Sequence, residues 1–171
     1  NYGITLQDGE LIAKTNMKEF GQTKHNLICC ITELSDMYML SKPTVASAFI
    51  EDIDKFFKEN KIIVTPNFMA KGATGLEFNF AYQIAGMDEE ILIDAFNIIN
   101  KSNLAKFIFD WNDIRDARQA KARKEVRGLA IINDDKEVDK KYLDSLIAKG
   151  TDYILFSERL KPENLQKLTA A

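Results

Sequence analysis

Four polar residues fall where one helix and two strands are expected, and together they could bind a divalent metal ion. Glu51 lies in an expected helix, Glu77 and Asn79 in one expected strand, and Asp94 in the next. Alternate residues of a strand share a face, so Glu77 and Asn79 point the same way. Mg²⁺ prefers oxygen ligands and, once bound, can activate water or stabilise charge on a phosphate. These four residues form the candidate catalytic site, and Glu77 and Asp94 are its expected metal ligands.

The densest run of basic residues could supply contacts to the phosphates of a nucleic acid. Its members are Arg115, Arg118, Lys121, Arg123, Lys124 and Arg127. Helical spacing puts Arg115 and Arg118 one turn apart, and Lys71, in a glycine-containing loop, is a further candidate. Asp113 and Asp116 interleave with the basic residues and can pair with them. The sequence leaves two interpretations open, a nucleic-acid-binding surface and a solvated helix end with salt bridges.

Hydrophobic periodicity arranges the chain as strands that alternate with helices. The expected elements are a hairpin at 2–14, helices at 23–40 and 43–60, a strand beginning at 62, strands at 78–82 and 91–96, a helix at 102–124, a strand at 126–132, a helix at 138–149, a strand at 153–156 and a short helix from 162. Asp8-Gly9 is a typical hairpin turn, and Ser41-Lys42-Pro43 is expected to break the first helix. A short helix at 91–96 stays open as an alternative. The order favours an α/β fold, a mixed sheet flanked by helices.

We expect an N-terminal hairpin and helix at residues 1–40 and an α/β core at residues 41–171, which can also form one compact domain. Between Ser41 and Asp134, the order of a helix, three strands, a long helix and a fourth strand resembles a restriction-endonuclease-like core. That resemblance implies an Asp on the second strand, a Glu-x-Lys on the third and an optional Glu on the first helix. Here Asn79 stands for the Asp, and Phe96 stands where the lysine is wanted.

Several longer segments together resemble one family over nearly the whole chain. They are DGEL at 8–11, KHNL at 24–27, KPTVASAFIEDI at 42–53, TPN at 65–67, FIFDWNDIRDAR at 107–118 and FSER at 156–159. The chain is similar to the C-terminal part of an uncharacterised bacterial, archaeal and phage family, whose halves are the domains of unknown function eighteen-twenty-eight and eighteen-twenty-nine. The family has an Asp where this chain has Asn79, and the resemblance implies no assigned activity.

Composition limits the classes of function that need consideration. The chain has 171 residues, of which 46% are hydrophobic and 29% charged, and a net charge of -3, as in soluble globular proteins. A weakly acidic protein is not expected to coat nucleic acid with its whole surface. The only two cysteines, Cys29 and Cys30, are adjacent in an expected helix and point apart, so we expect reduced thiols and a reducing, cytoplasmic compartment. No apolar run reaches the length of a membrane span.

Two functions from different classes fit these observations. The first is a binding module on a degenerate nuclease-like scaffold, associated with phages or mobile elements, that binds nucleic acid or a protein partner and needs no cofactor. The second is a divergent Mg²⁺-dependent nuclease that uses Glu51, Glu77 and Asp94, with Lys71 or Arg115 steadying the phosphate. A homodimer stays open under both hypotheses.

Overall fold

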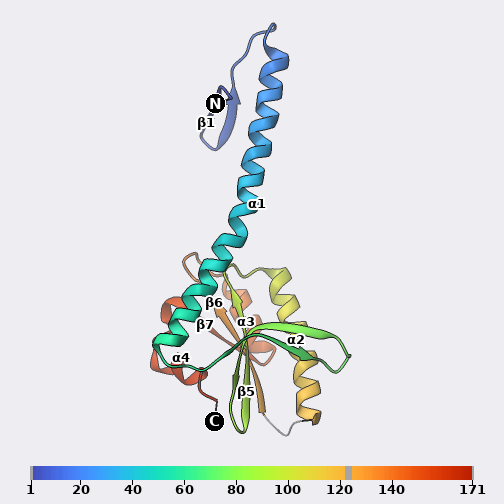
Figure 1. Ribbon diagram of the computed structural model, residues 1–171, viewed down its shortest axis with the longest axis vertical. Helices are drawn as coiled ribbons and strands as arrows, with labels where there is room; N and C mark the ends of the chain where they lie inside the picture. The colour runs from blue at the N-terminus through green and yellow to red at the C-terminus, as the bar shows by residue number, and fades with distance from the viewer. Residues whose placement is uncertain (1, 122–124, 171) are drawn as a thin grey trace. The chain divides into compact units, whose positions relative to one another are not determined.

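The chain folds into two compact units. The computed structural model describes residues 2–121 and 125–170, without the side chains of residues 39–45 and 119–121 (Figure 1). The first unit comprises Asn1–Ala48 and the second Phe49–Ala171. Each unit is described here by itself.

The first unit contains a two-stranded hairpin and most of a long helix. Strands β1 (Ile4–Gln7) and β2 (Glu10–Ala13) pair antiparallel, as the sequence predicts. Asp8 and Gly9 connect them with φ angles of 50° and 83°, the left-handed conformation that a two-residue hairpin turn requires. The hairpin is therefore specified locally by its turn residues.

Helix α1 (Phe20–Glu59) is a single element that begins in the first unit and ends in the second. The predicted break at Ser41-Lys42-Pro43 is therefore wrong. Proline removes one backbone hydrogen bond and usually disturbs the interior of a helix. The helix nevertheless continues through Pro43 without interruption.

The second unit is built on a five-stranded mixed sheet, which confirms the predicted α/β class. The strands are β3 (Thr65–Lys71), β4 (Glu77–Ala85), β5 (Glu89–Phe96), β6 (Glu125–Ile132) and β7 (Thr151–Leu155), in that spatial order. The first three pair antiparallel, and β5, β6 and β7 pair parallel. The first strand begins at Thr65 rather than at Ile62. It lies at an edge of the sheet, where Pro66 is tolerated because an edge strand can spare one N–H donor.

Helices cover both faces of this sheet, and a hydrophobic cluster fills each side (Figure 1). Helices α2 (Lys101–Lys121) and α3 (Lys140–Ala148) contribute Leu104, Phe107, Trp111, Ile114 and Leu146 to one cluster. The end of α1 and helix α4 (Pro162–Lys167) contribute Phe49, Ile53, Phe56, Phe57 and Leu165 to the other. We call these two sides the α2 face and the α1 face. A short 3₁₀ turn at Phe156–Glu158 joins β7 to α4.

Helix α2 begins one residue earlier than its expected cap at Ser102. The side chain of Asn100 accepts hydrogen bonds from the backbone N–H groups of Ser102 and Asn103, at 2.9 and 3.1 Å. An asparagine at this position satisfies donors that the helix cannot satisfy itself. The cap is therefore Asn100.

Strand β4 changes the face to which its side chains point. Phe78 and Phe80 belong to the α2-face cluster, whereas Tyr82 and Ile84 belong to the α1-face cluster. A regular strand would send all four to one face. The reversal occurs at Ala81, beside the position on β3 where Asn67 has a φ of 49°.

The ladder between β4 and β5 is short because of this irregularity. It runs from Ala85–Glu90 to Tyr82–Ile93 and leaves Asp94, Ala95 and Phe96 beyond it. On the other side, β5 pairs with β6 along its whole length. Asp94 therefore lies where β4 departs from β5.

Candidate functional site

The four residues of the predicted catalytic site lie on different faces of the second unit. Glu51 is an exposed residue of α1, and Glu77 and Asn79 are exposed at the start of β4. Phe78 and Phe80 point to the α2 face, so Glu77 and Asn79 point to the opposite one. Asp94 points to the α2 face, where it interacts with residues of α2. The structure brings Glu77 and Asn79 together on one strand face, but not with Asp94.

Asp94 instead meets two residues of α2 and two backbone groups. Its carboxylate accepts hydrogen bonds from the N–H of Ala95, at 3.1 Å, and from the N–H of Ala81. The pKa of Asp94 is raised to about 6, chiefly by burial and to a smaller extent by the nearby charge of Asp110, whereas the two N–H groups and Lys106 oppose the increase. The β4–β5 ladder ends at the pair Tyr82–Ile93, so the N–H of Ala81 has no partner in β5 and is available to Asp94.

Lys106 and Asp110 complete this group from one turn of α2. The Lys106 Nζ lies 2.5 Å from Asp110 Oδ2, at the i, i+4 spacing that helices provide for ion pairs. The Asp110 side chain is only 6% exposed, whereas Lys106 is 66% exposed and reaches it from solvent. We call Asp94, Lys106 and Asp110 the buried acid pair and its lysine. Lys106 and Asp110 were not identified from the sequence, although their i, i+4 spacing is visible in the segment KFIFD at 106–110.

The structure does not bring together Glu77 and Asp94, the two ligands that the sequence predicts for Mg²⁺. Mg²⁺ requires near-octahedral oxygen coordination, usually from one or two carboxylates together with several waters. Among the residues that the structure describes, no three acidic, histidine or cysteine side chains are grouped so that they could hold a metal. Of the two acids that are close, Asp110 is already bound to an ammonium group. The described contacts of this group are an ion pair between Lys106 and Asp110 and the hydrogen bonds of Asp94 to two backbone N–H groups.

The described arginines of the basic run are bound to acidic residues. Arg118 lies 3.7 Å from Glu90 and also over the ring of Phe68. Arg127 forms a two-pronged ion pair with Glu89. Arg115 lies 3.6 Å from its neighbour Asp116. A phosphate would compete with these partners for each arginine.

Of the remaining basic candidates, the structure describes the side chain of Lys71 alone. Lys71 is exposed at the end of β3. The side chain of Lys121, and the whole of Arg123 and Lys124, lie outside the described residues. The described geometry thus favours the interpretation of a helix end with salt bridges.

The loop at residues 72–75 is fixed by α2. The carboxylate of Asp113 accepts hydrogen bonds from the N–H and the hydroxyl of Thr74, at 3.0 and 2.6 Å. The N–H of Ala73 donates to the Asp113 carbonyl at 3.1 Å. A Cβ at Gly72 would lie 2.0 Å from an Asp113 oxygen, so this position requires glycine. Asp113 therefore has a structural role, which is to hold the turn between β3 and β4.

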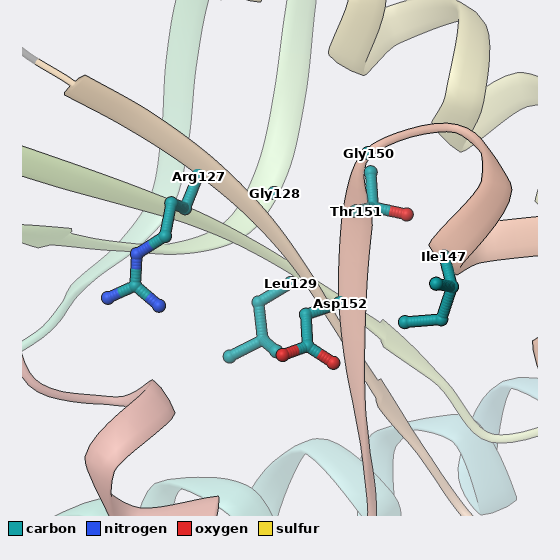
Figure 2. Close-up of a pocket in the computed structure, with 7 residues that line it drawn as sticks. All are labelled: Arg127, Gly128, Leu129, Ile147, Gly150, Thr151 and Asp152. Atoms are coloured by element: carbon teal, nitrogen blue, oxygen red, sulfur yellow. The ribbon is translucent and has the colours of Figure 1, made fainter.

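A small pocket opens at the amino ends of β6 and β7. Figure 2 shows its lining from both strands and from the end of α3, with Arg127 and Asp152 as its charged members. Arg127 is bound to Glu89 and to the carbonyl of Thr169, and Asp152 is bound to Lys167 at 2.9 Å. The hydroxyl of Thr151 donates to the Leu146 carbonyl. Since these polar groups have protein partners, the pocket offers little to a ligand.

Comparison with known proteins gives one match. Residues 72–159, more than half of the chain, match the family described as Domain of unknown function DUF1829. No curated protein and no solved structure matches the chain. None of the helices within the described residues combines the length and apolar character needed to cross a bilayer.

Proposed function

The chain belongs to the family described as Domain of unknown function DUF1829, and from this premise we propose that it is a non-catalytic binding module on a degenerate nuclease-like scaffold, with a protein as its partner. The order α1, β3, β4, β5, α2 and β6 supports the comparison with a restriction-endonuclease-like core. The free Cys29 and Cys30 support a reducing, cytoplasmic compartment. Fold alone does not assign function, so the proposal rests on the site.

The observation that carries the proposal is the position of Lys106. Its ammonium group lies against Asp110 and acts on Asp94, so one fixed positive charge balances the two neighbouring acids. A nuclease of the compared type would need a divalent cation between carboxylates and a free lysine near the phosphate. Here the lysine takes the place of the cation.

A protein partner is favoured over nucleic acid by the charge arrangement. Nucleic-acid binding depends on basic groups that are free to contact phosphates. Arg115, Arg118 and Arg127 are each engaged with an acid. The first unit, by contrast, exposes several large apolar side chains, which are typical of protein-binding surfaces.

The role of Lys106 is tested by replacing it. In Lys106→Ala, two acids face each other without a cation, so we expect a loss of about 1–2 kcal/mol of stability. We also expect Mg²⁺ or Mn²⁺ to raise the melting temperature of this variant but not that of the parent protein. Lys101→Ala, at an exposed position of the same helix, is the matched control. A parent protein that is itself stabilised by these metals would contradict the proposal.

Cleavage and binding assays complete the test. The parent chain is expected to leave single- and double-stranded DNA and RNA intact in Mg²⁺ and in Mn²⁺. It is also expected to show no salt-sensitive binding to these nucleic acids. Suppose that nucleic-acid binding weakens steeply with salt and is lost in the double variant Arg115→Ala with Arg118→Ala. The partner would then be a nucleic acid and not a protein.

A divergent Mg²⁺-dependent nuclease stays as the second candidate. It is favoured by one observation, the proximity of Asp94 and Asp110 beneath α2. Cutting that disappears in both Asp94→Asn and Asp110→Asn would establish it. Cutting that depends on Glu77 instead would support the arrangement expected from the sequence.

A further inference from the structure

The first unit has no buried core among its described side chains. Residues 2–38 and 46–48 contain no fully buried side chain. Several large apolar residues of the unit are between 47% and 93% exposed, and on α1 they include Phe20, Ile28, Ile31, Leu34 and Met37. Burial of apolar surface is the main force that stabilises a compact unit. The apolar surface whose burial could stabilise this unit is therefore still exposed to solvent.

The hairpin covers a different side of α1 from most of these residues. The side chain of Asn26 donates to the carbonyl of Tyr2 at 3.4 Å, and the hydroxyls of Thr23 and Thr15 are hydrogen-bonded at 2.8 Å. The hydroxyl of Tyr2 donates to Glu33. Thr23, Asn26 and Glu33 lie on one side of the helix, and Ile28 and Ile31 lie well away from them at 100° per residue.

The apolar residues follow the spacing of a coiled-coil seam. Phe20, Leu27, Ile31 and Leu34 are separated by seven, four and three residues, the alternation that keeps a seam facing a partner helix. Ile28 widens the seam on one side. We propose that this seam is a self-association surface, on which the same helix of a second copy of the chain packs to form a homodimer.

Charge around the seam suits a second copy. The positions that flank it are Ile28 and Ser35 on one side and Thr23, Cys30 and Met37 on the other, none of which carries a formal charge. Two identical helices can therefore approach without like-charge repulsion between their flanks. Lys24 occupies the seam position between Phe20 and Leu27, where its long side chain can extend the ammonium group to solvent.

Other occupants fit the same chemistry less well. A nucleic acid requires several cations, and the seam has only Lys24. A membrane surface selects helices with basic residues on the polar side, but that side of α1 carries Gln22, His25, Thr32 and Asp36. An isologous pair is the simplest arrangement in which one apolar seam covers another.

The strength of the dimer can be bounded from the exposed surface. The seam has five large side chains per copy, Phe20, Leu27, Ile28, Ile31 and Leu34, far fewer than the roughly 20–30 residues per side of a standard interface. We therefore expect a dimer that forms in the micromolar range and dissociates on dilution.

The test measures the mass of the full chain by analytical ultracentrifugation from sub-micromolar to several hundred micromolar protein. The mass is expected to rise from one chain to two. In Ile31→Glu with Leu34→Glu, self-association should weaken at least about tenfold, since charge is placed in the seam. His25→Glu with Thr32→Glu adds equal charge on the polar side and should dimerise like the parent chain.

Two results would overturn the dimer. The first is a parent chain that stays monomeric at every concentration. The second is equal dimerisation of the parent chain and the seam variant. Cooperative unfolding of the second unit, followed through its buried Trp111, verifies that each variant is folded. The inference rests on the proposed function in that it names the protein that covers the exposed apolar surface of the first unit, whereas the metal and cleavage tests concern the second unit, so the two can fail separately.

Discussion

Asp94 lies partly buried beneath α2, beside the ammonium of Lys106 and the carboxylate of Asp110. Removal from water disfavours the ionised form of a carboxyl group more than one nearby cation favours it. The pKa therefore rises although the side chain accepts two backbone hydrogen bonds. At this residue, burial decides the protonation state.

This burial predicts a specific dependence of stability on pH. The pKa of Asp94 rises from an ordinary 3.8 to about 6 on folding, so the protonated carboxyl favours the folded state. That contribution is fully present below pH 4 and is lost as the pH rises through 6. The loss amounts to roughly 3 kcal/mol, at about 1.4 kcal/mol per pH unit between the two pKa values. The stability of Asp94→Asn relative to the parent should therefore increase between pH 4 and 6.

Urea unfolding at a series of pH values measures this difference. Asp135→Asn, at an exposed position, controls for the loss of one negative charge. A difference between Asp94→Asn and the parent that stays flat from pH 4 to 7 would show that Asp94 is well hydrated in the folded protein.

At the scale of elements, the irregularity of β3 and β4 determines what lies on the α2 face. The reversal at Ala81 sends Phe78 and Phe80 towards α2 and ends the ladder with β5. The N–H of Ala81 then becomes available to Asp94. In a strand with regular alternation, the N–H of Ala81 would have stayed in the ladder of the sheet. It would then not have been available to the carboxylate of Asp94.

Asn67 is expected to stabilise this irregularity through its own backbone. Its φ of 49° lies in the left-handed region, which asparagine and glycine adopt and β-branched residues avoid. We expect Asn67→Gly to be close to neutral and Asn67→Val to cost about 1–2 kcal/mol. Strand propensity alone predicts the opposite order, because valine is the better strand former. Thermal unfolding of the two variants decides between these expectations.

At the scale of the whole molecule, the two units differ in how they are stabilised. The second has hydrophobic clusters on both faces of its sheet, whereas the described part of the first has no buried side chain. Amide exchange reports such differences, since opening costs little free energy where little apolar surface is buried.

Hydrogen exchange is therefore expected to separate the units. Amides of residues 20–38 should exchange orders of magnitude faster than those of β5 and β6 in dilute protein. Their protection should increase with protein concentration if the seam pairs, whereas β5 and β6 should not change. Mass spectrometry of peptic peptides measures both quantities. Equal protection of the two units at low concentration would show that the first unit is stable by itself.

The sequence alone determined the elements whose signals are local. Asp8-Gly9 specifies the first hairpin, because only residues that tolerate positive φ close that turn. Alternation predicts β4, and apolar spacing predicts α2 and α3. The extended form of residues 91–96 and the mixed α/β class follow from the same patterns and are confirmed.

Only the tertiary structure decided which of these residues meet. Periodicity identifies the two faces of a strand but not the helix that covers each one, so Glu77 and Asp94 were expected together although they point to opposite sides. Lys106 and Asp110 became neighbours of Asp94 because α2 packs on the face of the sheet to which Asp94 points, which no pattern in the sequence indicates. The continuation of α1 through Pro43 was likewise visible only in the structure, since the local rule predicts a break at an interior proline.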